Sequence, residues 1–137
     1  MRSALAPLVI AMLAGCAGSA QQTAVARQQA QARLAGLLAG KVAGPPRSCL
    51  PSYRADNMIV IDDNTIAFRD GPNRVWLTKP RGSCSLLGSP GYALVTRNVG
   101  GMGLCSGDIG QILDTTSRMT VGSCVMGDFT PYARPGG

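Results

Sequence analysis

The 137-residue sequence contains no histidine and no glutamate, and only 4% of its residues are aromatic. Without an imidazole, the chain cannot build a Ser-His-Asp triad, a Cys-His nucleophile or a His-ligated metal site from its own residues. Its acidic side chains are seven aspartates, against 13 lysines and arginines, so the formal net charge is +6. These absences predict a protein that is not an enzyme and that needs neither a metal nor a cofactor.

An apolar run at residues 4–13 follows Arg2 and is too short to span about 30 Å of hydrocarbon as a helix. It leads into Leu13-Ala14-Gly15-Cys16, which resembles the lipobox of bacterial lipoproteins. The resemblance implies a signal peptide that is cut before Cys16 and acyl chains on that cysteine. The alternative is a plain secretory signal that is cleaved near Ala17 or Ala20.

Several acyl chains at one cysteine would anchor the protein stably, because each buried methylene contributes about 0.8 kcal/mol. Ala17 follows the cysteine where inner-membrane lipoproteins of enteric bacteria typically carry Asp. The resemblance therefore favours the outer membrane, facing the periplasm, over the inner membrane. Nucleic acid is not an expected partner in that compartment.

The composition divides the chain into four parts. We expect a signal peptide at 1–15, a lipidated Cys16 with a basic helical stalk and a Pro/Gly linker at 16–46, a β-domain at 47–134 and a tail at 135–137. Residues 21–40 are rich in Ala, Gln, Arg and Leu, which are strong helix formers, and Gly40 and Gly44-Pro45-Pro46 end the helix.

Apolar residues of the stalk recur at spacings of three and four, which places them on one helix face. They are Leu34, Leu37, Leu38 and Val42. We expect this stripe to pack on the protein's own domain; the alternatives are an interface with a partner or a second copy, and disorder. The same stretch carries Arg27, Arg33 and Lys41 and no acid, which suits either a solvated tether or contact with anionic head groups.

From Arg47 onward, β-branched residues alternate with turn-forming Gly, Pro, Asn and Asp. The expected strands are Asn57–Asp62, Thr65–Arg69, Arg74–Thr78, Tyr92–Val99, Ile109–Asp114 and Met119–Met126. Asp63-Asn64 predicts a hairpin turn rather than a fragment of a calcium loop. Six or seven short strands predict an all-β fold, either a small meander barrel or a compact sandwich.

Four cysteines lie in the expected domain: Cys49, Cys84, Cys105 and Cys124. An even number in a small exported domain predicts two disulfides, and the sequence leaves three connectivities open. Of these we expect Cys84–Cys105 and Cys49–Cys124. The rival use, a four-thiolate metal site, lacks the Cys-x-x-Cys pairs that such sites carry.

Five segments resemble, in order, the signature of a family of small secreted or lipidated proteobacterial proteins. They are Cys49-Leu50, Asp62–Phe68, Gly82–Leu87, Leu104–Ile109 and Cys124–Pro131. The family is known only as a domain of unknown function. The resemblance implies a disulfide-stapled domain over residues 47–134, and it implies no activity, ligand or catalytic residue.

Basic residues around one tryptophan form the candidate ligand site. They are Arg69, Arg74, Trp76, Lys79 and Arg81. A stacking ring beside basic donors suits an anionic glycan or lipid headgroup, although a scarce aromatic in a small domain is typically a core residue. The loop Gly100–Gly103 lacks the spacing of a phosphate-binding fingerprint and is expected to be an inter-strand loop.

Two aspartates, Asp108 and Asp128, each follow a glycine and could act as a pair of catalytic carboxylates. Asp108 is explained more simply as a turn residue that accepts backbone hydrogen bonds, or as a partner of Arg97 or Arg118. The sequence therefore predicts a non-catalytic, periplasm-facing lipoprotein that serves as an envelope interaction or structural module. The alternatives are a module that binds an anionic glycan or lipid headgroup and a small Asp-dependent hydrolase.

Overall fold

The computed structural model describes residues 15–51, 57–97 and 103–136. Its elements are α1 (Gly15–Leu38), β1 (Val42–Ala43), β2 (Met58–Asp62), β3 (Thr65–Asp70), β4 (Arg74–Thr78), β5 (Tyr92–Thr96), β6 (Ile109–Asp114), β7 (Thr120–Val125) and β8 (Phe129–Ala133). Residues 1–14 of the expected signal peptide, the side chain of Cys16 and residues 100–102 of the glycine loop lie outside the described part. Within that part, the helix is not long and apolar enough to cross a membrane.

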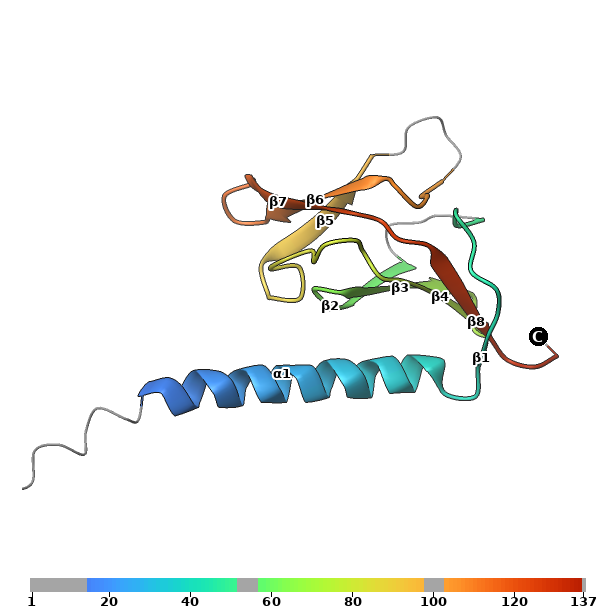
Figure 1. Cartoon of the computed structure of the whole chain (residues 1–137), viewed down its shortest axis with the longest axis horizontal. Helices are drawn as coiled ribbons and strands as arrows, with labels where there is room; N and C mark the ends of the chain where they lie inside the picture. Colours follow the sequence, from blue (N-terminus) through green and yellow to red (C-terminus); the bar gives the residue numbers. More distant parts are fainter. Residues whose placement is uncertain (1–14, 52–56, 98–102, 137) are drawn as a thin grey trace, which may run out of the picture.

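The strands form two antiparallel sheets. The larger has the order β1-β8-β4-β3-β2, and the smaller has the order β5-β6-β7. The sheets are stacked, and α1 runs along the far side of the five-stranded sheet (Figure 1). The expected all-β class is thus confirmed as a mostly β chain with two antiparallel sheets, one helix and two disulfides in the described residues. Two separate sheets over one core correspond to a sandwich rather than a closed barrel.

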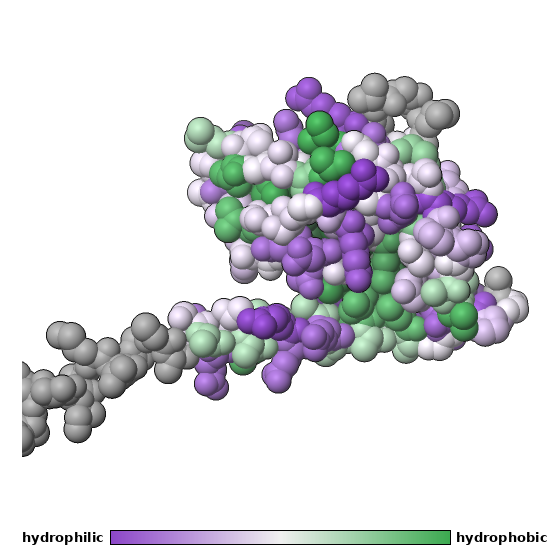
Figure 2. All heavy atoms as spheres, viewed as in Figure 1, coloured by the Kyte–Doolittle hydropathy of each residue, from purple (hydrophilic) through white to green (hydrophobic). Residues whose placement is uncertain are grey.

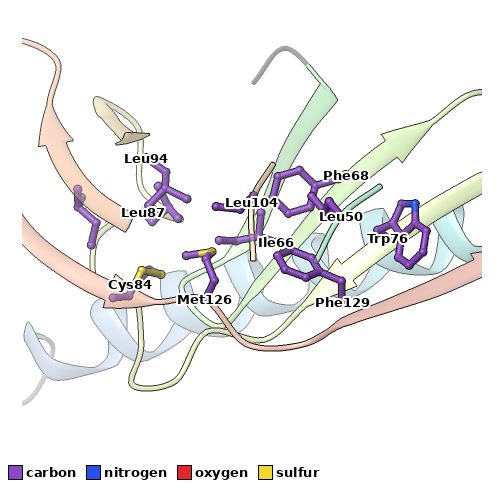
Figure 3. Close-up of a cluster of buried hydrophobic side chains, with 12 residues drawn as sticks. Leu50, Ile66, Phe68, Trp76, Cys84, Leu87, Leu94, Leu104, Met126 and Phe129 are labelled. Atoms are coloured by element: carbon purple, nitrogen blue, oxygen red, sulfur yellow. A yellow bond between two sulfur atoms is a disulfide. The ribbon is translucent and has the colours of Figure 1, made fainter. Parts of the chain in front are cut away.

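The main core lies between the two sheets. Ile66 and Phe68 of β3 and Phe129 of β8 meet Leu94 of β5 and Ile112 of β6, and all five are buried. In the close-up, Trp76 lies at one end of this cluster and Cys84 at the other (Figure 3). The alternation of Ile66 and Phe68 therefore sets which face of β3 points inward, as the period-two pattern predicts.

The five-stranded sheet is buried on its other face as well, because α1 packs there. A second buried cluster is formed by Ile61, Ala67, Val75 and Leu77, and the helix residues Ala30, Leu34, Leu37 and Leu38 pack against it. Figure 2 shows hydrophobic residues gathered where the helix meets the sheet. Burial on both faces explains why β3 and β4 are continuously apolar over most of their length.

The docking of the stripe on the protein's own domain is confirmed for its three leucines. Val42 is the exception, because the helix ends at Leu38 and Val42 lies in β1 with 63% of its surface exposed. Gly40 has a φ of +70°, a left-handed conformation that commonly ends helices. Residues 18–29 of the helix are exposed, and this half projects past the five-stranded sheet (Figure 1).

The segment that we expect to be a Pro/Gly linker is attached to the larger sheet. β1 pairs with the end of β8, and the Gly44 amide donates to the Pro131 carbonyl at 2.8 Å. Arg47 and Phe129 then exchange two backbone hydrogen bonds of 2.8 Å each. These contacts hold the chain between helix and domain against β8.

β8 is a strand that the sequence analysis misses, because Pro131 stands at its centre. A proline has no N–H and is unfavourable inside a sheet. The Pro131 carbonyl faces β1, and the nitrogen of the same strand residue points to the same side. The missing N–H of Pro131 therefore leaves the β4–β8 hydrogen bonds intact. It faces the β1 side of the strand, just beyond the last paired residue of β1.

The disulfides join Cys49 to Cys105 and Cys84 to Cys124. The expected pairing, Cys84–Cys105 and Cys49–Cys124, is therefore wrong. The physical reason is the sheet topology: Cys49 and Cys105 face each other in an isolated antiparallel bridge, whereas β7 carries Cys124 to the loop that follows β4. Since all four sulfurs are bonded, none is available as a thiolate metal ligand.

Candidate functional site

Arg69 and Arg74, two of the residues expected to bind an anion, lie on opposite faces of the five-stranded sheet. Arg69 is opposite Val75 in the β3–β4 ladder, and Val75 packs on the side that α1 covers. Arg74 precedes Val75 and points to the other face, where its guanidinium forms an ion pair with Asp70 at 3.5 Å. One ligand therefore cannot contact both guanidinium groups across the sheet.

Lys79 and Arg81 lie beyond the other end of β4. Both are exposed, and the Arg81 guanidinium donates to the Ser106 hydroxyl oxygen at 3.0 Å. Arg74, in contrast, is the first residue of β4. The structure thus divides the predicted basic set into separate groups instead of one site.

Trp76 is a core residue with one polar contact. Only 4% of its surface is exposed, and its indole N–H donates to Asp70 Oδ2 at 3.1 Å. Asp70 therefore contacts both Trp76 and Arg74. This carboxylate fixes the ring and the guanidinium relative to each other at the end of the core.

The same ring lines a cleft of about 410 Å³ at the β1 edge of the larger sheet. We call it the arginine cleft, and its lining residues are Val42, Ala43, Gly44, Pro45, Arg47, Pro51, Arg74, Trp76, Pro131 and Ala133. Apart from Arg74 and Trp76, none of these residues belongs to the predicted ligand set.

The floor of the arginine cleft follows from the strand register. Ala133 of β8 lies between Val42 of β1 and Arg74 of β4, and Pro131 lies beside Trp76. Residues paired across an antiparallel ladder project to the same face, so these side chains share one surface. Ala133 is the small residue at the centre of this row and leaves space above it, and Gly44, Pro45 and Arg47 after β1 line the side of the cleft.

Asp108 closes a turn. Its Oδ2 accepts a hydrogen bond from the Cys105 amide at 2.7 Å, and its own amide donates to the Cys105 carbonyl at 3.1 Å. The turn interpretation is therefore confirmed. The turn places the Asp108 carboxylate beside the Cys49–Cys105 disulfide. Arg97 lines the same shallow hollow as Asp108, whereas Asp128 is exposed.

Asp63 has a long-range role that local patterns do not indicate. Its Oδ1 accepts from the Gly88 amide at 2.7 Å, and its carbonyl accepts from the Cys84 amide at 2.8 Å. Next to it, the Asn64 amide donates to Asp62 Oδ1 at 2.8 Å, which confirms the hairpin turn. The aspartates of this turn thus hold the hairpin together and position the loop that carries Cys84.

Asp114 organises the turn between β6 and β7. Its Oδ1 accepts backbone hydrogen bonds from Thr116 at 2.8 Å and from Ser117 at 3.0 Å. These backbone donors, Ser117 first, lower the pKa of Asp114 below its ordinary value of 3.8, because they stabilise the charged form.

This lowered pKa predicts an acid-dependent contribution to stability. A carboxylate with a depressed folded pKa contributes fully above its unfolded value, and the contribution is lost as the pH falls through the folded pKa. We expect urea unfolding of an Asp114→Asn variant to show a flatter pH dependence below pH 3.8 than the parent. An NMR titration that places the Asp114 pKa at or above 3.8 would contradict the prediction.

Two of the three basic residues in the expected stalk contact the protein itself. Arg33 donates from Nη1 to the Val60 carbonyl of edge strand β2 at 3.0 Å. Lys41 donates from Nζ to the Leu37 carbonyl at 2.8 Å, close to the negative end of the helix dipole. These two cations are thus bonded within the protein, which neither the solvated-tether interpretation nor the head-group interpretation anticipated.

The outer face of the three-stranded sheet is not covered by another helix or strand of the described chain (Figure 1). Because Leu94, Ile112 and Cys124 point into the core, the alternate positions point outward. We call these the neutral face: Ala93, Val95, Ile109, Gln111, Leu113, Val121, Ser123 and Val125. None is charged, and Ile109 is 59% exposed, Val121 46% and Val95 41%.

Sequence reasoning misses both the arginine cleft and the neutral face. Arg47 and Arg74 line the same cleft because β8 lies between β1 and β4, and the proline in β8 hides that strand from sequence reasoning. The alternation of β5, β6 and β7 was visible, but it did not reveal that their second face stays uncovered. A comparison of charge on the two faces of each expected strand is the signal that could have found the neutral face.

Neither a protein-family model, nor a curated protein, nor a solved structure matches this chain.

Proposed function

We propose that this protein is a non-catalytic lipoprotein of the bacterial envelope that holds a protein partner on the neutral face. The observation that carries the proposal is the contrast between two sheet faces. The outer face of the larger sheet is covered by the chain's own helix, whereas the neutral face exposes Val95, Ile109 and Val121. An exposed apolar surface of this kind marks an interaction site in soluble domains.

The occupant is a protein surface that is itself apolar and uncharged. The chain carries a net charge of +6, yet none of it lies on the neutral face. A glycan or lipid polyanion would be attracted to the arginines elsewhere, whereas an uncharged face matches the charge-depleted centre of a protein interface. Arg97 lines a hollow with Ile109 and Gln111, so it lies at the border of the neutral face, where a polar rim is expected.

Anchoring rests on the lipobox-like Leu13–Cys16. Helix α1 has 24 residues, which corresponds to about 36 Å at 1.5 Å per residue, and its exposed N-terminal half would hold the domain away from the bilayer. We place the anchor in the outer membrane, with the domain in the periplasm. Loss of the protein from the membrane fraction in a Cys16→Ser variant, with loss of the acyl mass, tests this part.

Site-specific photo-crosslinking in intact envelopes tests the partner. A benzophenone amino acid at Val121 samples the neutral face, and the same residue at Val25 is a matched control, because the two valines are 46% and 45% exposed. We expect a discrete adduct from position 121 and none from position 25. An additional Ile109→Lys substitution should abolish the adduct, because it buries a charge in the interface.

Equal adducts from both positions, or an adduct from position 121 that survives Ile109→Lys, would overturn the proposal. Circular dichroism of the Ile109→Lys variant serves as the folding control. Ile109 is the most exposed of the apolar residues on the neutral face, so this variant is expected to fold like the parent.

A further inference from the structure

The arginine cleft offers two cations whose hydrogen-bonding capacity is largely unused. The Arg47 side chain makes no hydrogen bond or ion pair within the described chain, where only its backbone is bonded, to Phe129. Among the described residues Arg74 forms one ion pair, with Asp70, and its side chain is 46% exposed. A guanidinium has five N–H donors, so both groups can still bind an anion.

The remaining lining of the arginine cleft is mostly apolar. Three proline rings, Pro45, Pro51 and Pro131, contribute no N–H, and Val42 is 63% exposed beside them. At the inner end lies the Trp76 ring, whose N–H is already bonded to Asp70. A ligand that fits therefore combines one anionic group with an apolar body.

We propose that the arginine cleft binds a small amphipathic anion, whose phosphate, sulfonate or carboxylate group is held by Arg47 and Arg74 and whose apolar part lies against the prolines and Trp76. The volume of about 410 Å³ falls in the range of pockets for small molecules, roughly 300–1,000 Å³. This site is separate from the neutral face, since no residue is common to the two.

Trp76 is the single tryptophan of the chain and lines the arginine cleft, so its emission is a direct probe of binding there while the protein stays folded. The experiment titrates the full chain with dodecyl phosphate below its micelle concentration and follows the emission of Trp76. We expect a saturable shift. An Arg47→Ser variant should bind about tenfold more weakly or worse, as expected for the loss of a charge-assisted hydrogen bond.

Arg69→Ser is the matched control, because it removes the same charge from the opposite face of the same sheet. It should leave the affinity unchanged within about twofold at constant salt. Arg47→Ser is the better test, since the Arg47 side chain makes no hydrogen bond or ion pair with the described residues, whereas Arg74→Ser also removes the ion pair to Asp70.

Three outcomes would overturn the proposal: equal binding of dodecyl maltoside, equal binding of inorganic phosphate, or equal weakening in Arg47→Ser and Arg69→Ser. Phosphatidylglycerol vesicles distinguish the source of the ligand. A shift of Trp76 emission that depends on Arg47 supports the site and assigns it to a lipid headgroup. A response to dodecyl phosphate without one to vesicles supports the site and assigns it to a free amphiphile.

Discussion

Replacing Cys84 and Cys124 by alanine is expected to unfold the protein at 37 °C or to leave it marginally stable. The disulfide spans 40 residues, and loop-closure entropy alone corresponds to about 4 kcal/mol. Domains of this size typically have about 5–15 kcal/mol of stability in total. Cys84 is fully buried and Cys124 is 5% exposed, so losing the two sulfurs also leaves a cavity in the core. Urea unfolding followed by the fluorescence of Trp76 measures the loss.

The matched control is the Cys49/Cys105 double alanine variant. Its disulfide closes a longer stretch of 56 residues, so the entropy effect is again about 4 kcal/mol. Both of these cysteines are only half-buried, however, and no core cavity should follow. We expect the variant without Cys84 and Cys124 to be the less stable of the two. The reverse order would mean that packing around Cys84 contributes little.

The pairing itself can be read from a non-reducing peptide map. Cleavage after Lys and Arg places the four cysteines on separate peptides, 48–54, 82–97, 98–118 and 119–137. The structure predicts that 48–54 is linked to 98–118 and that 82–97 is linked to 119–137. Any other pair of linked masses would contradict the topology on which the core rests.

Local patterns located six strands correctly because their signals are local. Ile66 and Phe68 alternate with Ala67, and the turns at Asp63-Asn64 and at Gly71, with its φ of +67°, lie where the residues favour them. β1 was missed because two residues carry no period. The disulfide pairing was wrong because it depends on which segments meet across the sandwich, and spacing along the chain does not contain that information.

The candidate site was less predictable than the fold for the same reason. Trp76 and Arg74 were singled out correctly as neighbours, since they are two apart on one strand face. Arg69 was grouped with them by proximity in sequence, although the β3–β4 register sets it opposite Val75 and therefore on the other face from Arg74. Arg47 is 27 positions before Arg74 and reaches the cleft only through β8, so no local pattern could include it.

Replacing Gly127 by alanine is expected to be strongly destabilising, although the residue sits in no special backbone conformation. A Cβ at this position would overlap the carbonyl oxygen of Lys79, which is backbone and cannot rotate away. The neighbouring Thr78 hydroxyl donates to the Gly127 carbonyl at 3.1 Å in a buried site. Separating the two segments would weaken this bond and the start of the β4–β8 ladder. Overpacking of a core typically costs about 1–3 kcal/mol, and we expect Gly127→Ala to reach the upper end.

Gly36→Ala is the same chemical change, but it is expected to raise the stability of the protein. Gly36 lies within α1, is exposed, and would have nothing within 4 Å of an added Cβ. Alanine is favoured over glycine in helices by about 0.8–1 kcal/mol, so this variant should be more stable than the parent by up to that amount, and less if the helix end frays. Urea unfolding of both variants in parallel measures the contrast. A Gly127→Ala variant as stable as the parent would contradict the prediction. It would show that the end of β4 can shift away from β8, so that the close approach of Gly127 to Lys79 is not needed to hold the two strands together.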